Sequence, residues 1–193
     1  MRRQTVGKRK IELAEQVLAS FYEARDLFDW ARSPGAFGGE GDTRPAEGEQ
    51  DDVRKRRNTY FVPIERMQKH SELFAKLQSQ RYAFMAVFGT NAVAPFEELR
   101  KVQVRISVSA QTIIRMIGNR HAEERNQALM ERCEAEIWDG TYEALGQEDP
   151  IKTSIARVIS DIEGSCGPVL LHSSHTIFRL PIWFAKWKNK LAG

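Results

Sequence analysis

The sequence predicts an all-α protein, an elongated up-and-down bundle of about four main helices. Four long segments each carry one apolar stripe at helical spacing, and breaks containing glycine and proline separate them. No segment gives a convincing strand, because the alternating valines at 102–108 also fit the longer helical register around them. Helices with one apolar stripe bury it against one another, which favours a bundle.

The first predicted helix covers residues 6–32. One face is apolar and the opposite face carries acids, as is typical of a helix packed on a core. Bases dominate its beginning, where positive charge opposes the helix dipole, so we expect them to interact with something outside the fold. The apolar stripe includes Ile11, Ala14, Leu18, Phe21 and Phe28.

Residues 35–52 are predicted to form a flexible acidic loop. They contain five glycines, one proline and six acids against the single base Arg44, a composition that cannot bury much apolar area. A basic cluster, Arg54, Lys55, Arg56 and Arg57, follows directly. It has two interpretations: a nucleic-acid contact, or the solvated start of a helix whose charges balance the acidic loop. The second is the commoner reason for a charge run.

Three more helices complete the predicted bundle. The second covers 58–88, and the third runs from Pro95 to about Trp138, a length of roughly 60 Å at 1.5 Å per residue. Gly118-Asn119 either kinks or splits this third helix. The fourth begins at Pro150, with Asp149 as its N-cap, and is predicted to stop at Gly164, Gly167 and Pro168.

The 193-residue chain fits one domain, which we predict to be a bundle over 1–168 followed by a basic amphipathic tail, 169–193. Charge is unevenly distributed. Residues 1–10 carry five bases and the tail carries four, with no acid in either, so within a net charge of +3 residues 11–168 carry −6. Basic ends attract anionic membrane surfaces or nucleic acid.

The tail is the most suggestive segment. Its apolar residues share one helical face, and lysines alternate with its tryptophans. Two interpretations follow: contact with an anionic bilayer surface, or docking of the aromatic side chains on the bundle or on a second copy, with the lysines in solvent. The predicted membrane or partner contacts are Trp183, Phe184, Lys186, Trp187, Lys188 and Lys190.

The sequence offers little catalytic chemistry. His172 and His175 form an H-x-x-H with Cys166 six residues earlier, a set that could bind a metal, although surface histidines are the commoner explanation. No Glu-x-x-His pair or nucleophile elbow is present. We therefore predict no catalytic residue and no cofactor.

Residues 11–16 and 31–35, with Phe37-Gly38 and 41–44 after them, resemble a group of uncharacterised bacterial helical proteins. In some of these a transmembrane helix precedes the matching region. The resemblance therefore implies that Met1-Arg2-Arg3 lies just after a membrane anchor, where an excess of Lys and Arg is expected on the cytoplasmic side. This chain has no apolar run of about 18–20 residues and no signal peptide, so we expect it to be neither secreted nor membrane-spanning.

Three functions follow from these patterns. The leading hypothesis is a non-enzymatic interaction or scaffold protein in the cytoplasm, with a protein partner or self-association and with an anionic membrane surface as a further partner. The first alternative is a nucleic-acid-binding accessory protein that uses the basic clusters. The second is a metal-dependent enzyme built on the two histidines.

Overall fold

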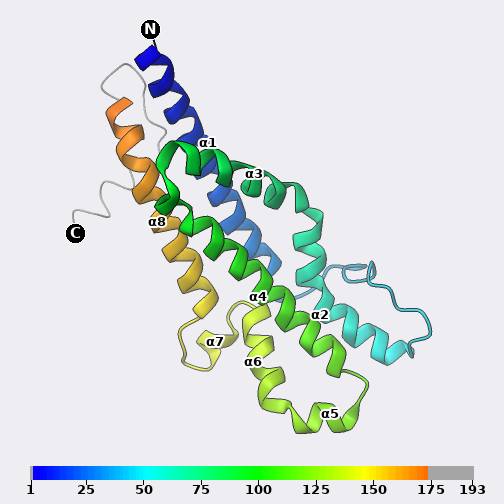
Figure 1. Cartoon of the computed structure of the whole chain (residues 1–193). Helices are drawn as coiled ribbons and strands as arrows, with labels where there is room; N and C mark the ends of the chain where they lie inside the picture. Colours follow the sequence, from blue (N-terminus) through cyan, green and yellow to red (C-terminus); the bar gives the residue numbers. More distant parts are fainter. Residues whose placement is uncertain (1, 174–193) are drawn as a thin grey trace.

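The computed structural model describes the backbone of residues 2–173 and the side chains of residues 7–171. Every regular element in that range is a helix, which confirms the all-α prediction (Figure 1). The elements are α1 (Arg2–Ala31), α2 (Asp51–Lys69), α3 (Ser71–Phe88), η1 (Thr90–Val93), α4 (Ala94–Met116), α5 (Arg120–Arg125), α6 (Gln127–Ile137), α7 (Thr141–Ala144) and α8 (Pro150–Ser173). None of these helices is both long and apolar enough to cross a bilayer.

Helix α1 is the predicted first helix, and its apolar stripe is buried. Phe21 and Phe28 are fully buried, whereas Ile11 near the start is half-buried. Val17 and Ala24 widen the buried stripe, so the helix has enough apolar surface for more than one neighbour. It packs against α3 and α8, and also against α2.

The second predicted helix is two helices, so the prediction of one helix over 58–88 is wrong. Helix α2 begins at Asp51, where two acids in the first turn suit the positive helix end. His70 leaves the helical conformation (φ −112°, ψ 28°) and separates α2 from α3. The break lets α2 pack mainly on α4 while α3 packs on α1. No glycine or proline marks it in the sequence.

The third predicted helix is a hairpin rather than a 60 Å rod. Helix α4 ends at Met116, and Gly118 adopts a positive φ of 91° that reverses the chain. A Cβ on Gly118 would lie 3.2 Å from a methyl group of Val53, so the turn favours glycine for space as well as conformation. After the short α5, helix α6 returns along α4 (Figure 1).

The fourth helix begins as predicted and ends later than predicted. Asp149 Oδ1 accepts hydrogen bonds from the backbone N–H groups of Ile151 (2.8 Å) and Lys152 (3.2 Å), which confirms the N-cap. Helix α8 then continues through Pro168 to Ser173. Proline lacks the N–H that would bond the carbonyl of Gly164, four positions earlier, so the helix passes this point with one backbone hydrogen bond fewer. Leu170 beyond it is buried, so α8 stays packed on the bundle past Pro168.

Helix α4 lies at the centre of the bundle, in contact with α2, α6 and α8. Its predicted stripe is buried, whereas Val104 and Val108 are about half-exposed, as a helical register requires. Ser109, expected to interrupt the stripe, is buried and donates a hydrogen bond to the carboxylate of Glu136. The buried stripe of α4 consists of Leu99, Val102, Ile106, Ala110 and Ile113.

Helices α1 and α8 are antiparallel neighbours. Near one end Arg32 pairs with Asp149, and ten residues back along α1 the Tyr22 hydroxyl donates to Glu163, fourteen residues forward along α8 (2.6 Å). Continuing this register brings the C-terminal end of α8 beside the first turns of α1, as Figure 1 shows. The two ends of the described chain therefore lie at the same end of the bundle.

Candidate interaction surfaces

We name the shared end the basic pole: residues 2–10 of α1 together with the C-terminal end of α8 (Figure 1). Lys8 and Arg9 are exposed, and Lys10 lies over the ring of Phe88, with Nζ 4.8 Å from the ring centroid. All five bases of residues 1–10 belong to this pole, and the chain leaves it to enter the basic tail. The predicted contacts Trp183, Phe184, Lys186, Trp187, Lys188 and Lys190 lie outside the described residues and stay predictions.

An apolar groove lies beside the basic pole, between α1 and the C-terminal half of α3. Its volume is about 570 Å³. Ala83 and Ala86 are exposed and small, so this part of α3 does not fill the space next to α1. The groove is lined by Arg9, Lys10, Glu12, Leu13, Gln16, Ala83, Ala86 and Val87.

At the opposite end of α1, the buried guanidinium of Arg66 fixes the acidic loop. Its nitrogens donate to the carbonyls of Trp30 (3.0 Å) in the last turn of α1 and of Ser33 (2.9 Å) and Gly35 (2.8 Å) just beyond it. It also holds both carboxylate oxygens of Glu40, at 2.7 and 3.0 Å. This pairing lowers the pKa of Glu40 to about 2. The turn at residues 35–40 thus has defined contacts, and the prediction of a flexible acidic loop over 35–52 stays a prediction.

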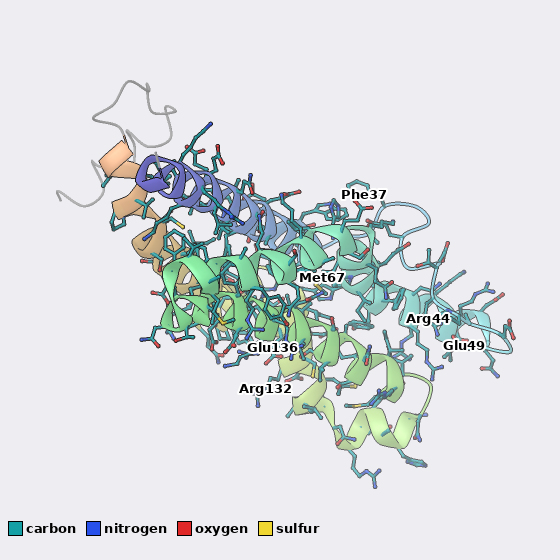
Figure 2. The ribbon with its side chains drawn as sticks, turned by 45° about the horizontal axis from the view of Figure 1, so that its top comes forward. Phe37, Arg44, Glu49, Met67, Arg132 and Glu136 are labelled. Carbon is teal, nitrogen blue, oxygen red and sulfur yellow. The ribbon has the colours of Figure 1, made fainter. Side chains whose placement is uncertain are left out.

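Phe37 sits at the turn that Arg66 holds. Its side chain is 75% exposed, the largest exposed fraction among the large apolar residues described (Figure 2). Its N–H donates to the Glu40 carboxylate (2.9 Å), and its carbonyl accepts from the Glu40 N–H (3.0 Å). The loop thus presents an aromatic ring to solvent on a fixed backbone, an arrangement typical of a partner anchor.

Glu49, near the end of the loop, joins it to α2 (Figure 2). Its carboxylate accepts hydrogen bonds from Arg44 and from Arg57 (2.6 Å), and it is mostly buried. Arg44 in turn donates to Asn58 on α2 (3.0 Å). The two guanidinium groups hold the pKa of Glu49 at about 2.

Replacing Glu49 by Gln should destabilise the protein by about 2 kcal/mol at pH 7, the typical contribution of hydrogen bonds to a charged group. In the natural chain the folded pKa of about 2 lies below the ordinary value of 4.5, so the stabilisation is complete above pH 4.5 and is lost as the pH falls towards 2. Urea midpoints from pH 2 to 7 should therefore converge for the two proteins near pH 2. A difference between the two urea midpoints that stayed constant with pH would contradict this assignment. All other acids are present in both proteins and affect both midpoints equally.

The basic cluster at the start of α2 is partly engaged within the molecule. Arg57 donates to the Ile117 carbonyl (2.6 Å) as well as to Glu49, and Arg56 pairs with Glu123 (2.5 Å). Arg54 pairs with Asp51 (2.8 Å), and Lys55 is exposed. Three of the four predicted nucleic-acid contacts thus have acidic partners, which supports the interpretation of a helix start that balances nearby acids.

A second buried guanidinium, that of Arg32, joins three helix ends. It donates to the carbonyls of Glu136 (3.0 Å) and Ala135 (3.3 Å) in the last turn of α6 and to Asp149 Oδ2 (2.7 Å) at the start of α8. Arg32 and Asp149 are 2% and 1% exposed, so the pair is closed to solvent. The backbone carbonyl of Arg32 accepts from the Asp139 N–H (2.8 Å).

Next to this pair, Asp139, Glu143 and Asp149 place three carboxylate oxygens within 4.8 Å of one another. Lys152 Nζ lies 2.7 Å from both Asp139 and Glu143, while Arg32 holds Asp149. These bonds raise the pKa of Lys152. The acidic group is therefore balanced by two cations of the fold, and we assign it a structural role.

Of the predicted metal candidates, Cys166 alone lies among the residues whose side chains are described. Cys166 is fully buried in α8, and burial raises the pKa of its thiol to about 12. The side chains of His172 and His175 lie outside the described residues, so the H-x-x-H set stays a prediction. Cys133 is also buried, and burial raises its pKa.

Sequence reasoning missed both buried arginines, although a signal was present. Arg66 lies between Ile64 and Met67 in a run of buried positions, and Arg32 follows Phe28 by one helical turn on the α1 stripe. A base on an apolar face is a sign of a buried ion pair, because an unpaired charge there is costly. The partners, however, cannot be identified from spacing.

Comparison with known proteins gives no relative for this chain. No family model matches it, and neither does any curated protein or any solved structure. The resemblance of residues 11–44 to bacterial helical proteins is untested and stays a prediction.

Proposed function

We propose that this protein is a non-enzymatic scaffold that docks on an anionic membrane surface through its basic pole. The observation that carries the proposal is the antiparallel contact of α1 and α8, which brings residues 2–10 and the start of the tail to one end of the bundle. Two basic segments that are distant in sequence then act on the same surface.

The distribution of charge favours one orientation of the bundle on the membrane, with the basic pole towards the lipid. A base near an anionic bilayer contributes about 1 kcal/mol, and the tail adds two tryptophans of the kind favoured at the bilayer interface. Residues 11–168 carry a net −6, which opposes contact of the rest of the bundle with the same surface. We place the contact on the cytoplasmic leaflet, where anionic lipids are concentrated.

The Phe37 loop supports the scaffold part of the proposal. It lies at the end of α1 opposite the basic pole, so a bound membrane leaves it free (Figure 1). A fixed, exposed aromatic ring suits a protein partner that offers an apolar pocket.

Vesicle flotation tests the membrane contact. We expect the full chain to float with phosphatidylcholine vesicles that contain phosphatidylserine and not with phosphatidylcholine alone, and binding should weaken as salt rises. Replacing Lys186, Lys188 and Lys190 by Gln should lower the affinity about 100-fold, since three bases contribute about 3 kcal/mol.

The matched control neutralises bases elsewhere. Arg54→Gln with Lys55→Gln removes two exposed charges from the start of α2, away from the basic pole, and should leave vesicle binding unchanged. An equal loss in both variants would contradict a directed contact. If neither vesicle type binds, and the chain instead retains duplex DNA in a manner that depends on Arg54 and Lys55, the nucleic-acid alternative replaces this proposal.

A further inference from the structure

We propose that the apolar groove between α1 and α3 is the docking site of the chain's own tail, residues 180–191, in the absence of a membrane. This inference rests on the proposed function, because it assigns a regulatory partner to the same membrane-contact segment. The groove and the tail then form a switch in which docking in cis and binding to lipid exclude each other.

The first argument is proximity. Counted from the contact of Tyr22 with Glu163, the antiparallel register places Ser173 beside about residue 12, in the third turn of α1. The groove is lined by residues 9–16 of the same helix. Helices α8 and α3 both pack on α1, so the end of α8 lies at most about one and a half helix diameters, roughly 15 Å, from the groove. The linker 174–179 can extend about 20 Å, which is enough to reach it.

The second argument is shape and chemistry. Leu180, Phe184, Trp187 and Leu191 recur at helical spacing and form one apolar stripe. The floor of the groove is apolar, because Leu13, Ala83, Ala86 and Val87 line it. A volume of about 570 Å³ lies in the range that receives large ligands and leaves space for aromatic side chains. Docking would remove the tryptophans from water and leave the lysines at the surface.

The third argument is charge, which limits how firmly the tail docks. Arg9 and Lys10 border the groove, with Glu12 as the only acid in its lining, while the tail carries lysines and no acid. Like charges oppose the docked state, whereas apolar burial favours it. Added salt screens the repulsion and should strengthen docking. Anionic lipid should favour release of the tail from the groove, because the lipid head groups attract the lysines that the groove repels.

Amide hydrogen exchange of the full chain, without lipid, tests the docked state. Residues 180–191 should be protected, and exchange should become about tenfold faster in Ala86→Trp, which fills the groove, and in Trp187→Ser, which removes a docking side chain. Ala75→Trp is the matched control: Ala75 is exposed on the same helix and does not line the groove, so protection should persist. Protection should also increase with salt, opposite to vesicle binding.

The inference would be overturned if the tail were unprotected in the natural chain, or if it were equally protected in Ala86→Trp. Neither result bears on the membrane contact, which vesicle flotation tests separately. Protection that rises with protein concentration would assign the groove to the tail of a second copy and overturn docking in cis. Ala86→Trp should also bind phosphatidylserine vesicles more tightly than the natural chain, because no docked state competes. An unchanged vesicle affinity would contradict the exclusion of one state by the other.

Discussion

Replacing Arg32 by Met should destabilise the protein by about 3–5 kcal/mol, the cost of leaving one member of a buried ion pair without its partner. Methionine retains an unbranched apolar stem, so the loss concerns the charge and its hydrogen bonds. Asp149 would stay buried without its cation, and two carbonyls at the end of α6 would lose their donor. Urea denaturation at pH 7, followed by circular dichroism, measures the difference in unfolding free energy.

Two further variants show whether the pair itself is responsible. Asparagine is as good an N-cap as aspartate, so Asp149→Asn removes the charge and leaves the cap of α8 intact. The double variant Arg32→Met with Asp149→Asn should then be more stable than the sum of the single losses predicts. Arg120→Ala, which breaks an exposed pair with Glu124, should change stability by less than about 1 kcal/mol. Additive losses in the double variant would contradict direct coupling.

Replacing Arg66 by Met should release the acidic loop and destabilise the protein by about 3 kcal/mol or more, because buried acceptors lose their donors. Arg66 is fully buried and holds carbonyls of three residues along with the carboxylate of Glu40. The effect on amide exchange in the loop should be larger than the effect on the rest of the bundle. Amide exchange across residues 35–50 should accelerate while that of α4 changes only as far as global stability does.

Lysine at position 66 keeps the charge and distinguishes attraction from geometry. An ammonium group is a compact point charge and cannot reproduce the planar fork that reaches three carbonyls and a carboxylate together, so Arg66→Lys should restore little stability. Glu40→Gln removes one charge and leaves the carbonyl contacts, and should therefore open the loop less than Arg66→Met. If amide exchange in the loop were equal in all three variants and in the natural chain, Arg66 would not be the residue that holds the loop.

Some of the candidate surface follows from sequence. The concentration of bases in residues 1–10 and 169–193 is a fact of composition, and the apolar stripe of the tail follows from periodicity. That the described end of α8, from which the tail continues, lies beside the basic start of α1 depends on the antiparallel contact of the two helices. The groove beside the pole depends on how far two helices approach, which Ala83 and Ala86 decide together with their neighbours on α1.

Phe37 shows the limit of composition as a guide. A segment with five glycines and six acids is typical of disorder, and no local pattern in residues 35–52 suggests otherwise. The missing information lay in α2, where Arg66 supplies a buried cation 26 residues after Glu40. Arg66 supplies part of the contacts that oppose the entropy cost of ordering the loop. The Gly41 N–H, which donates to Glu65, and the Glu49 carboxylate, which Arg44 and Arg57 bind, supply others.

The sequence by itself determined the features that depend on neighbours within a few residues: the all-α class, the stripes of α1 and α4 and the Asp149 cap. Helical periodicity and capping are local, so they can be read along the chain. The tertiary structure decided the break at His70, the passage of α8 through Pro168, the contacts that hold the loop and the antiparallel contact of α1 with α8. Each depends on contacts between distant segments, such as Arg32 with Asp149, 117 residues apart, whose energies outweigh local preference.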